Sequence, residues 1–255
     1  MSQLGSIGLA GAYGDDIGAN PNQGSAYVFR NLDTATGTVT ENAKLISSDG
    51  ASGNLFGYSV SQSGSIGLVG AYTSNIGTNS AQGAGYVFRN LNTATGTITQ
   101  NVKLTASDGA TQDYFGYSVS QSGSIGLVGA YGDDIGANTD QGSAYVFRNL
   151  DMATGTITQN VMLIASAGAI NDCLWRVGEP IGLVGAYNDD IGANVDQGSA
   201  YLFRNLDTAT GTITQNVKLT ASDGAANNFF GISVSLNGDQ FTVGAYGKSS
   251  DTGKA

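Results

Sequence analysis

The sequence repeats itself with a period of 59 residues, and this period constrains the fold more than any other feature. The tripeptide Gly-Ala-Tyr begins at Gly11, Gly70, Gly129, Gly185 and Gly244. Successive copies are therefore 59, 59, 56 and 59 residues apart. Residues 129–168 and 185–224 are identical at 33 of 40 positions. An internal repeat of this length predicts an array in which each copy forms one unit of supersecondary structure.

Each copy contains four runs of residues with the pattern of β-strands. These are TITQNVKL (212–219), GSAYVF (142–147), SIGLVGAY (124–131) and YFGYSVS (114–120). Three of them alternate side chains of different character on two faces, whereas SIGLVGAY is uncharged throughout and suits burial on both faces. Clusters of Gly, Asn, Asp and Ser separate the runs and predict turns. The expected fold is all-β, a β-propeller of four-stranded antiparallel blades without a helix.

The copies define one propeller-type array over residues 1–255. The expected repeat units are 1–55, 56–114, 115–173, 174–229 and 230–255, of which the fourth is degenerate and the last is partial. The chain contains five Gly-Ala-Tyr strands but only four of each of the other three strand types. It therefore provides four to five blades, and it also fits a segment of a larger ring. Unpaired edge strands in such an array predict self-association.

Three Phe-Gly pairs form a second repeated motif. Phe56-Gly57, Phe115-Gly116 and Phe230-Gly231 each precede a Gly-Ala-Tyr at the same distance. This pattern resembles the FG-GAP repeat of integrin alpha-chain N-terminal β-propellers, with Tyr in place of the family's final Pro. The resemblance implies extracellular adhesion or ligand recognition. It also implies calcium, which many members bind in an Asp-x-Asp-x-Asp-Gly loop, but the corresponding SQSGS at 61–65 and 120–124 has no carboxylate, so that site does not carry over.

A second candidate for calcium is the loop that follows each Gly-Ala-Tyr. Three copies carry adjacent Asp residues together with Asn, and hard oxygen donors of this kind suit Ca²⁺. The candidate ligands are Asp15, Asp16, Asp133, Asp134, Asp140, Asp189, Asp190 and Asp196. In the second copy, at 72–83, neutral residues replace every Asp while Ile76, Gly77, Asn79 and Gly83 persist. The loops are therefore either repeated calcium sites or turns that Asp and Asn side chains cap through their own hydrogen bonds.

The fourth copy departs from its siblings in residues 173–182. It reads CLWRVGEPIG, three residues shorter than its siblings, and holds the chain's only Cys (Cys173), its only Trp (Trp175) and one of its two prolines. One choice of codons for 174–182, read from the second nucleotide, encodes Phe-Gly-Val-Ser-Val-Ser-Gln-Ser, which is the missing strand. We interpret the segment as a local frameshift that weakens its blade. A reactive thiol beside an aromatic binding platform is the alternative.

Composition excludes several classes of partner. The formal net charge is -10 and the isoelectric point is about 4.1, which oppose binding to nucleic acid. The sequence has no His and a single Cys, so the commonest general base and an internal disulfide framework are both absent. No apolar run is long enough for membrane insertion, and the first residues do not read as a signal peptide. We expect a bacterial cell-surface or secreted location, as part of a longer protein.

The residues therefore favour a non-enzymatic recognition or adhesion module, with a protein or carbohydrate ligand held by the loops between strands. No nucleophile, base and orienting group can be assembled into a catalytic site, and no cofactor other than Ca²⁺ is expected. Two alternatives stay open. One is a decayed propeller fragment without current function, and the other is a glycan hydrolase that uses paired carboxylates.

Overall fold

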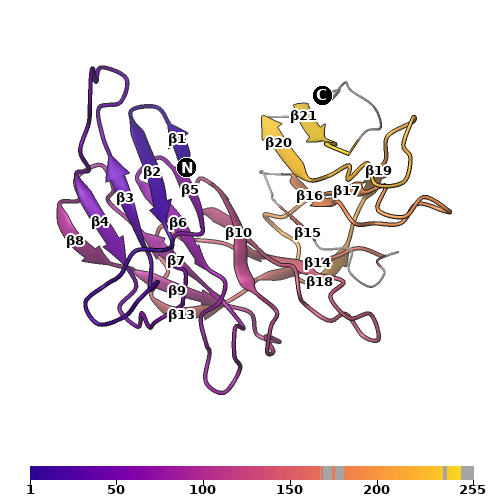
Figure 1. Cartoon of the computed structure of the whole chain (residues 1–255), viewed down its shortest axis with the longest axis horizontal. Helices are drawn as coiled ribbons and strands as arrows, with labels where there is room; N and C mark the ends of the chain where they lie inside the picture. Colours follow the sequence, from indigo (N-terminus) through magenta and orange to yellow (C-terminus); the bar gives the residue numbers. More distant parts are fainter. Residues whose placement is uncertain (167, 169–173, 176–180, 238–239, 248–255) are drawn as a thin grey trace.

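Strands joined by turns make up the chain (Figure 1). The computed structural model describes residues 1–166, 168, 174–175, 181–237 and 240–247, and contains no helix within those ranges. The all-β prediction is therefore confirmed for this part of the chain. Within it, no helix is long and apolar enough to cross a membrane.

The strands form four larger sheets and one two-stranded sheet, which we call blades one to five. Blade one contains β1 (Ser2–Leu4), β2 (Ile7–Ala12), β3 (Ser25–Phe29), β4 (Ala43–Ile46) and β8 (Gly96–Thr99). Blade two contains β5 (Ser59–Ser63), β6 (Ile66–Ala71), β7 (Ala84–Phe88), β9 (Val102–Thr105) and β13 (Gly155–Thr158). Blade three contains β10 (Phe115–Ser122), β11 (Ile125–Ala130), β12 (Ser143–Phe147), β14 (Val161–Ile164) and β18 (Gly211–Thr214). Blade four contains β15 (Leu174–Trp175), β16 (Gly182–Ala186), β17 (Ser199–Phe203) and β19 (Val217–Leu219), and blade five contains β20 (Ser233–Asn237) and β21 (Gln240–Gly244).

A Gly-Ser turn joins the first two strands of each of the first three blades. In blade two, Gly64 and Ser65 separate β5 from β6, and Gly64 has a φ of +57°. A two-residue hairpin loop of this kind needs φ > 0 at its first position, which glycine adopts without a steric penalty. Gly5 and Gly123 stand at the same position in blades one and three. The following strand β11 is buried at all but its first residue, as its uncharged sequence predicts.

The prediction of one strand across 212–219 is wrong, because the structure divides this stretch between two blades. β18 ends at Thr214 and pairs in parallel with β14 of blade three. β19 begins at Val217 and pairs with β17 of blade four. The same exchange gives blades one and two a fifth strand from the following copy, so Gly96–Thr99, inside the expected unit 56–114, completes blade one.

A Gln-Asn pair holds the chain where it crosses between blades. Gln159 Oε1 accepts a hydrogen bond of 3.0 Å from the Ser107 amide, and its Nε2 donates to Ser107 Oγ at 2.8 Å. The Asn160 amide donates to Val146 O at 2.8 Å, and Asn160 Oδ1 accepts from the Arg148 amide at 2.7 Å. The two neighbours thus bind two different blades, and β13 and the strand after it cannot continue in one sheet.

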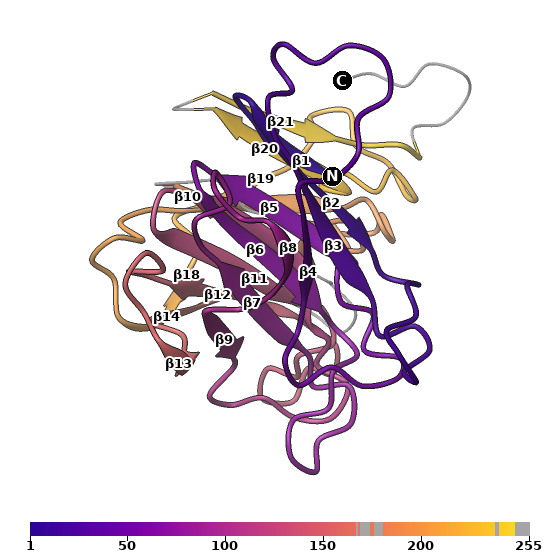
Figure 2. The ribbon, with the colours of Figure 1, turned by 90° about the vertical axis from the view of Figure 1, so that its left-hand side faces the viewer.

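Consecutive blades pack against each other in chain order. The first strands lie together, β1 with β5 and β5 with β10, and Figure 2 looks onto blade one with the later blades behind it. Arginine side chains also bind the backbone of the next blade. Arg89 Nε donates to Leu150 O at 2.9 Å, and Arg148 Nε donates to Leu206 O at 2.7 Å. This arrangement is consistent with a β-propeller, which confirms the predicted fold class.

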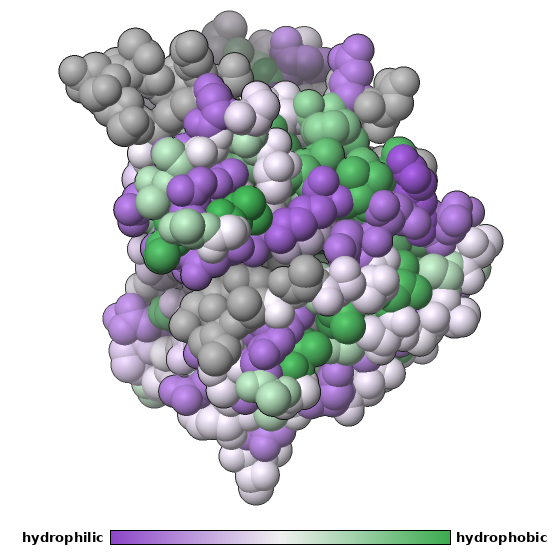
Figure 3. Space-filling view, turned by 90° about the vertical axis from the view of Figure 1, so that its right-hand side faces the viewer, coloured by the Kyte–Doolittle hydropathy of each residue, from purple (hydrophilic) through white to green (hydrophobic). Residues whose placement is uncertain are grey.

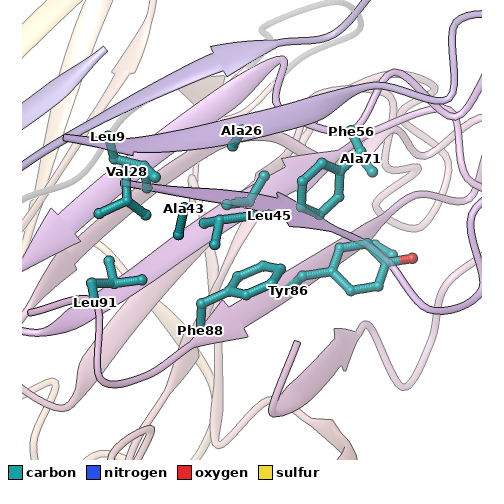
Figure 4. Packing of buried hydrophobic residues seen from close by; sticks show 12 residues of the cluster. Leu9, Ala26, Val28, Ala43, Leu45, Phe56, Ala71, Tyr86, Phe88 and Leu91 are labelled. Carbon is teal, nitrogen blue, oxygen red and sulfur yellow. The ribbon is translucent and has the colours of Figure 1, made fainter. Parts of the chain in front are cut away.

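Apolar side chains fill the space between the blades (Figure 4). Between blades one and two, Leu9, Val28 and Leu45 face Phe56 and Phe88, and all five are fully buried. Phe56 and Phe115 of the Phe-Gly pairs therefore belong to the core, whereas Phe230 is partly buried. Burying one such ring contributes about 2 to 3 kcal/mol, so Phe56 and Phe115 are a main source of blade-to-blade stability.

The row of blades is open at its ends in the described part of the chain. No ladder of hydrogen bonds joins blade five to blade one, and Figure 1 shows these blades at opposite ends of the row. The face of blades four and five turned to the viewer in Figure 3 carries small hydrophobic groups among hydrophilic residues. Val195 and Phe241 are among the exposed apolar side chains, at 56% and 45%. Self-association through the edges stays a prediction.

The first strand of blade four keeps only part of the sibling register. Leu174 lies opposite Ala186, just as Phe115 lies opposite Ala130 in blade three. β10 then continues to Ser122, whereas β15 is two residues long among the described residues. Cys173 and residues 176–180 lie outside the described residues, as does the side chain of Trp175, so the thiol and platform interpretation stays untested.

Candidate functional site

The Phe-Gly and Gly-Ala-Tyr motifs meet at one end of the blades and place the candidate site there. The Phe56 amide donates to Gln23 O at 2.9 Å, which draws the second copy onto the first. Gly57, at φ +90°, lies so close to Gly11 that a Cβ on Gly11 would stand 1.8 Å from Gly57 O. Only a pair of glycines permits this approach. As a result, the residues that follow both motifs stand side by side in space.

Six tyrosines come together at this end and form a continuous group of rings, which we call the tyrosine row. Its members are Tyr13, Tyr58, Tyr72, Tyr114, Tyr117 and Tyr131. Centroids of neighbouring rings lie 4.5 to 6.0 Å apart, within the range of favourable aromatic pairs. The Tyr58 hydroxyl also donates to the Tyr117 hydroxyl at 2.9 Å. The row spans blades one to three without a break.

The tyrosine row is a surface feature, in contrast to the core tyrosines of the same copies. Tyr13 is 52% exposed and Tyr58 is 37% exposed, and the other four are half-buried. Tyr86 and Tyr145 are fully buried by comparison. Partial burial, together with Tyr58 and other neighbouring rings, raises the pKa of Tyr72, so its hydroxyl stays neutral at pH 7. The row therefore offers apolar ring surface and hydroxyl groups to a ligand.

The first Asp of each loop binds side chains of its own blade. Asp15 Oδ2 accepts hydrogen bonds from Ser25 Oγ at 2.7 Å and Tyr27 OH at 3.0 Å, and it pairs with Lys44 Nζ at 2.7 Å. The Lys44 ammonium and the Ser25 hydroxyl hold the pKa of Asp15 below its usual range. Asp189 makes the same contacts with Ser199, Tyr201 and Lys218, and Asp133 makes those with Ser143 and Tyr145. These carboxylates thus hold β-strands together.

The second Asp of each loop caps the loop itself. Asp16 Oδ1 accepts a hydrogen bond of 2.8 Å from the amide of Asn22, six residues on. Asp134 and Asp190 do the same for Asp140 and Asp196, at 2.9 and 2.8 Å. In the second copy Asn75 Oδ1 accepts from the Ala81 amide at 2.9 Å. An amide oxygen serves as well as a carboxylate here, which explains how the second copy keeps its loop without an Asp.

Asp140 and Asp196, the last two candidate calcium ligands, have a left-handed backbone conformation. Their φ angles are +50° and +54°, a region that Asp and Asn adopt more readily than most residues.

Within the described ranges, no group of three or more Asp, Glu, His or Cys side chains could hold a metal ion. Calcium binding by these loops stays a prediction, to be tested by thermal unfolding in Ca²⁺, in Mg²⁺ and in a chelator; a selective rise of Tm in Ca²⁺ would support it.

Asp113 is a buried carboxyl beside the tyrosine row that sequence reasoning did not single out. Its side chain is 3% exposed, and burial raises its pKa to about 6. The nearby carboxylates Asp133 and Asp108 contribute to this rise, while a hydrogen bond of 2.5 Å from the Ala110 amide opposes it. Asn54 and Asn228 stand at the equivalent position before the other two Phe-Gly pairs, and Asn228 Oδ1 accepts the same backbone hydrogen bond at 2.7 Å.

Because the pKa of Asp113 is higher in the folded chain than in the unfolded chain, the folded state binds more protons between pH 4 and pH 6. Its contribution to stability is complete below about pH 4 and is lost as the pH rises through 6. We expect Asp113→Asn to raise the free energy of unfolding by about 1 to 3 kcal/mol at pH 7 and to change it little at pH 4. Urea unfolding at both pH values measures this, and an equal effect at both would contradict it.

The signal for the tyrosine row was present in the sequence. Tyr follows Gly-Ala in every copy, and a second Tyr follows Phe-Gly in the second and third. A strand pattern alone does not show that these two positions meet, because they lie on different strands of different blades. The meeting depends on the Gly-to-Gly contact between blades.

Comparison with known proteins agrees with the repeat pattern. A family model described as FG-GAP repeat matches residues 39–88, 98–147 and 213–255, which together make up more than half of the chain. No curated protein matches the sequence. The matched segments contain all three Phe-Gly pairs and the three Gly-Ala-Tyr motifs that follow them. The chain therefore belongs to the FG-GAP repeat family.

Proposed function

We propose that the chain is a non-enzymatic recognition module that binds a protein partner through the tyrosine row. FG-GAP repeats are generally found in adhesion or recognition modules, are typically non-enzymatic and are typical of extracellular or surface proteins. The observation that carries the proposal is the row itself, six half-buried or exposed tyrosines in contact across three blades. Tyrosine supplies large rigid contact area and is enriched at protein interfaces.

The surroundings of the row indicate the chemistry of the partner. The exposed carboxylates of Asp16, Asp134 and Asp190 lie in the loops that follow the Gly-Ala-Tyr strands. The whole chain carries a net charge of -10. A complementary partner has an apolar centre for the rings and a rim of Lys or Arg side chains for the carboxylates. Charges on the rim steer association and are screened by salt, so binding weakens as ionic strength rises.

Arrays of purified extracellular proteins and of glycans, probed with the full chain at low and high salt, test this proposal. The informative variant is Tyr13→Ala/Tyr58→Ala, which removes the two most exposed rings of the row. The matched control is Tyr246→Ala, an exposed tyrosine of 70% that stacks on Phe229 outside the row. We expect salt-sensitive protein binding that the double variant weakens at least tenfold, or about 1.4 kcal/mol, and the control leaves unchanged.

The arms of the arrays separate the alternatives. Binding to glycans and to no protein, lost in the same double variant, would replace the protein partner by a carbohydrate at the same surface. Binding that both variants retain in full would place the contact elsewhere and contradict the proposal. A circular-dichroism spectrum and Tm of each variant show whether a loss of binding reflects a loss of fold.

A further inference from the structure

Three of the four larger blades hold one ammonium group between a carboxylate and a tyrosine. In blade one Lys44 Nζ pairs with Asp15, in blade two Lys103 with Asp49, and in blade four Lys218 with Asp189. Each ammonium also lies over the ring of the tyrosine opposite it in the sheet, with its nitrogen 5.5 to 5.8 Å from the ring centroid. In each of these three blades, one lysine ammonium therefore neutralises one aspartate carboxylate.

Blade three breaks this balance. Met162 takes the lysine position, opposite Tyr145 in the sheet, as Lys103 stands opposite Tyr86 in blade two. Blade three also has two carboxylates where the other blades have one. The Tyr145 hydroxyl lies 2.7 Å from Asp133 Oδ2 and 3.2 Å from Asp108 Oδ1.

A tyrosine hydroxyl has one proton and can serve only one of these carboxylates fully. Asp133 is the nearer and also receives the Ser143 hydroxyl. Asp108 Oδ2 accepts no hydrogen bond from the described residues, although the equivalent oxygen of Asp49 binds the Lys103 ammonium. Burial and the neighbouring acids raise the pKa of Asp133, whereas the pKa of Asp15, which has its lysine, is lowered.

A pocket of about 310 Å³ opens beside the position of the missing ammonium. Its lining includes Ser107, Asp108, Gln159, Met162, Gly211 and Thr212. Met162 and Val161 supply the apolar part of a lining that is otherwise mostly polar. The exposed carboxylate of Asp108 thus has no cationic partner among the described residues, and it lines this pocket together with Met162, which replaces the sibling lysine.

We propose that this pocket in blade three binds a primary alkylammonium ion, which donates to Asp108 as Lys103 donates to Asp49 in blade two. The source of the ion is a free alkylamine or the lysine side chain of another protein, since both present the same group. The site is partly open to solvent, so we expect a dissociation constant on the order of millimolar.

Titration of the ¹⁵N-labelled full chain with n-butylammonium, followed by amide chemical shifts, tests the site. We expect saturable shifts at Asp108, Met162 and Thr212. The same titration with Nα-acetyl-lysinamide compares the two sources, and the tighter ligand identifies the source. n-Butanol has the stem without the charge and is expected to give no saturable shift.

Two variants and a control decide the assignment. Asp108→Asn removes the acceptor and should weaken binding at least fivefold. Met162→Lys restores the sibling lysine, should abolish binding and should raise Tm, so a loss of fold cannot explain the result. Asp49→Asn is the matched control, because Lys103 already occupies that blade, and binding should not change. Saturable binding of n-butanol, or equal binding by wild type and Met162→Lys, would overturn the proposal.

Discussion

Replacing Gly116 with alanine is expected to lower the free energy of unfolding by at least about 3 kcal/mol. Gly116 is the glycine of the Phe-Gly pair in blade three and has a φ of +92°. A Cβ there would lie 2.4 Å from Ala84 O and 3.2 Å from the Ala71 amide nitrogen, both in blade two. The added methyl group meets backbone atoms that cannot rotate away, so the blades must separate or the strand must shift.

Gly123→Ala is the matched control for this substitution. Gly123 also has a positive φ, +55°, but no heavy atom lies within 4 Å of its ideal Cβ position. The control isolates the conformational cost, about 1 kcal/mol. Guanidinium unfolding of both variants measures the difference. Equal losses of stability would show that close packing between blades does not determine the need for glycine in the Phe-Gly pair.

Restoring the fourth copy is expected to stabilise the chain by at least about 2 kcal/mol. The change replaces residues 173–180 with the corresponding eleven residues 114–124 of the third copy. The sequence at 173–180 has no Phe-Gly pair, and the equivalent Phe115 is fully buried between blades. The replacement adds that ring, the glycine that packs on the preceding blade and the residues that pair β10 with β11 as far as Ser122. It also removes Pro180, which lacks an amide donor for a ladder.

A chimera with the same eleven residues in scrambled order controls for length and composition. Denaturant unfolding followed by far-UV circular dichroism compares the three proteins. We expect a higher midpoint for the restored chain only. A restored chain no more stable than wild type would contradict the interpretation of 173–182 as a damaged strand, and a loss of stability would indicate that the present sequence has a role of its own.

Much of the fold could be predicted from the repeat and the alternation of side chains. The uncharged run at 124–131 and the Gly-Ser turns define hairpins through local chemistry alone, and the structure places β10, β11 and β12 close to the predicted runs. The stretch 212–219 could not be divided from sequence, because its alternation continues through Gln215 and Asn216. Only the hydrogen bonds of those two side chains to different blades show where the strand changes sheets.

The candidate site was harder to predict for the same reason. The Asp loops attract attention as carboxylate pairs, yet Asp133 and Asp189 are buried and bind Ser and Tyr side chains of their own blade. The tyrosine row forms between copies, from Tyr72 of one and Tyr117 of the next at 5.0 Å. Contacts between repeats depend on how blades stack, which a period and a pattern do not give.

The claim that the tyrosine row is the contact surface is tested most directly by mapping the bound partner. Amide chemical shifts of the ¹⁵N-labelled chain, recorded with the protein partner selected on the arrays, show which residues it touches. We predict the largest changes at residues 56–58, 72–76, 114–117 and 131–135, where the row and its loops lie. Changes concentrated at the Gly-Ser turns around Gly5, Gly64 and Gly123, at the far ends of the same strands, would contradict the proposed function.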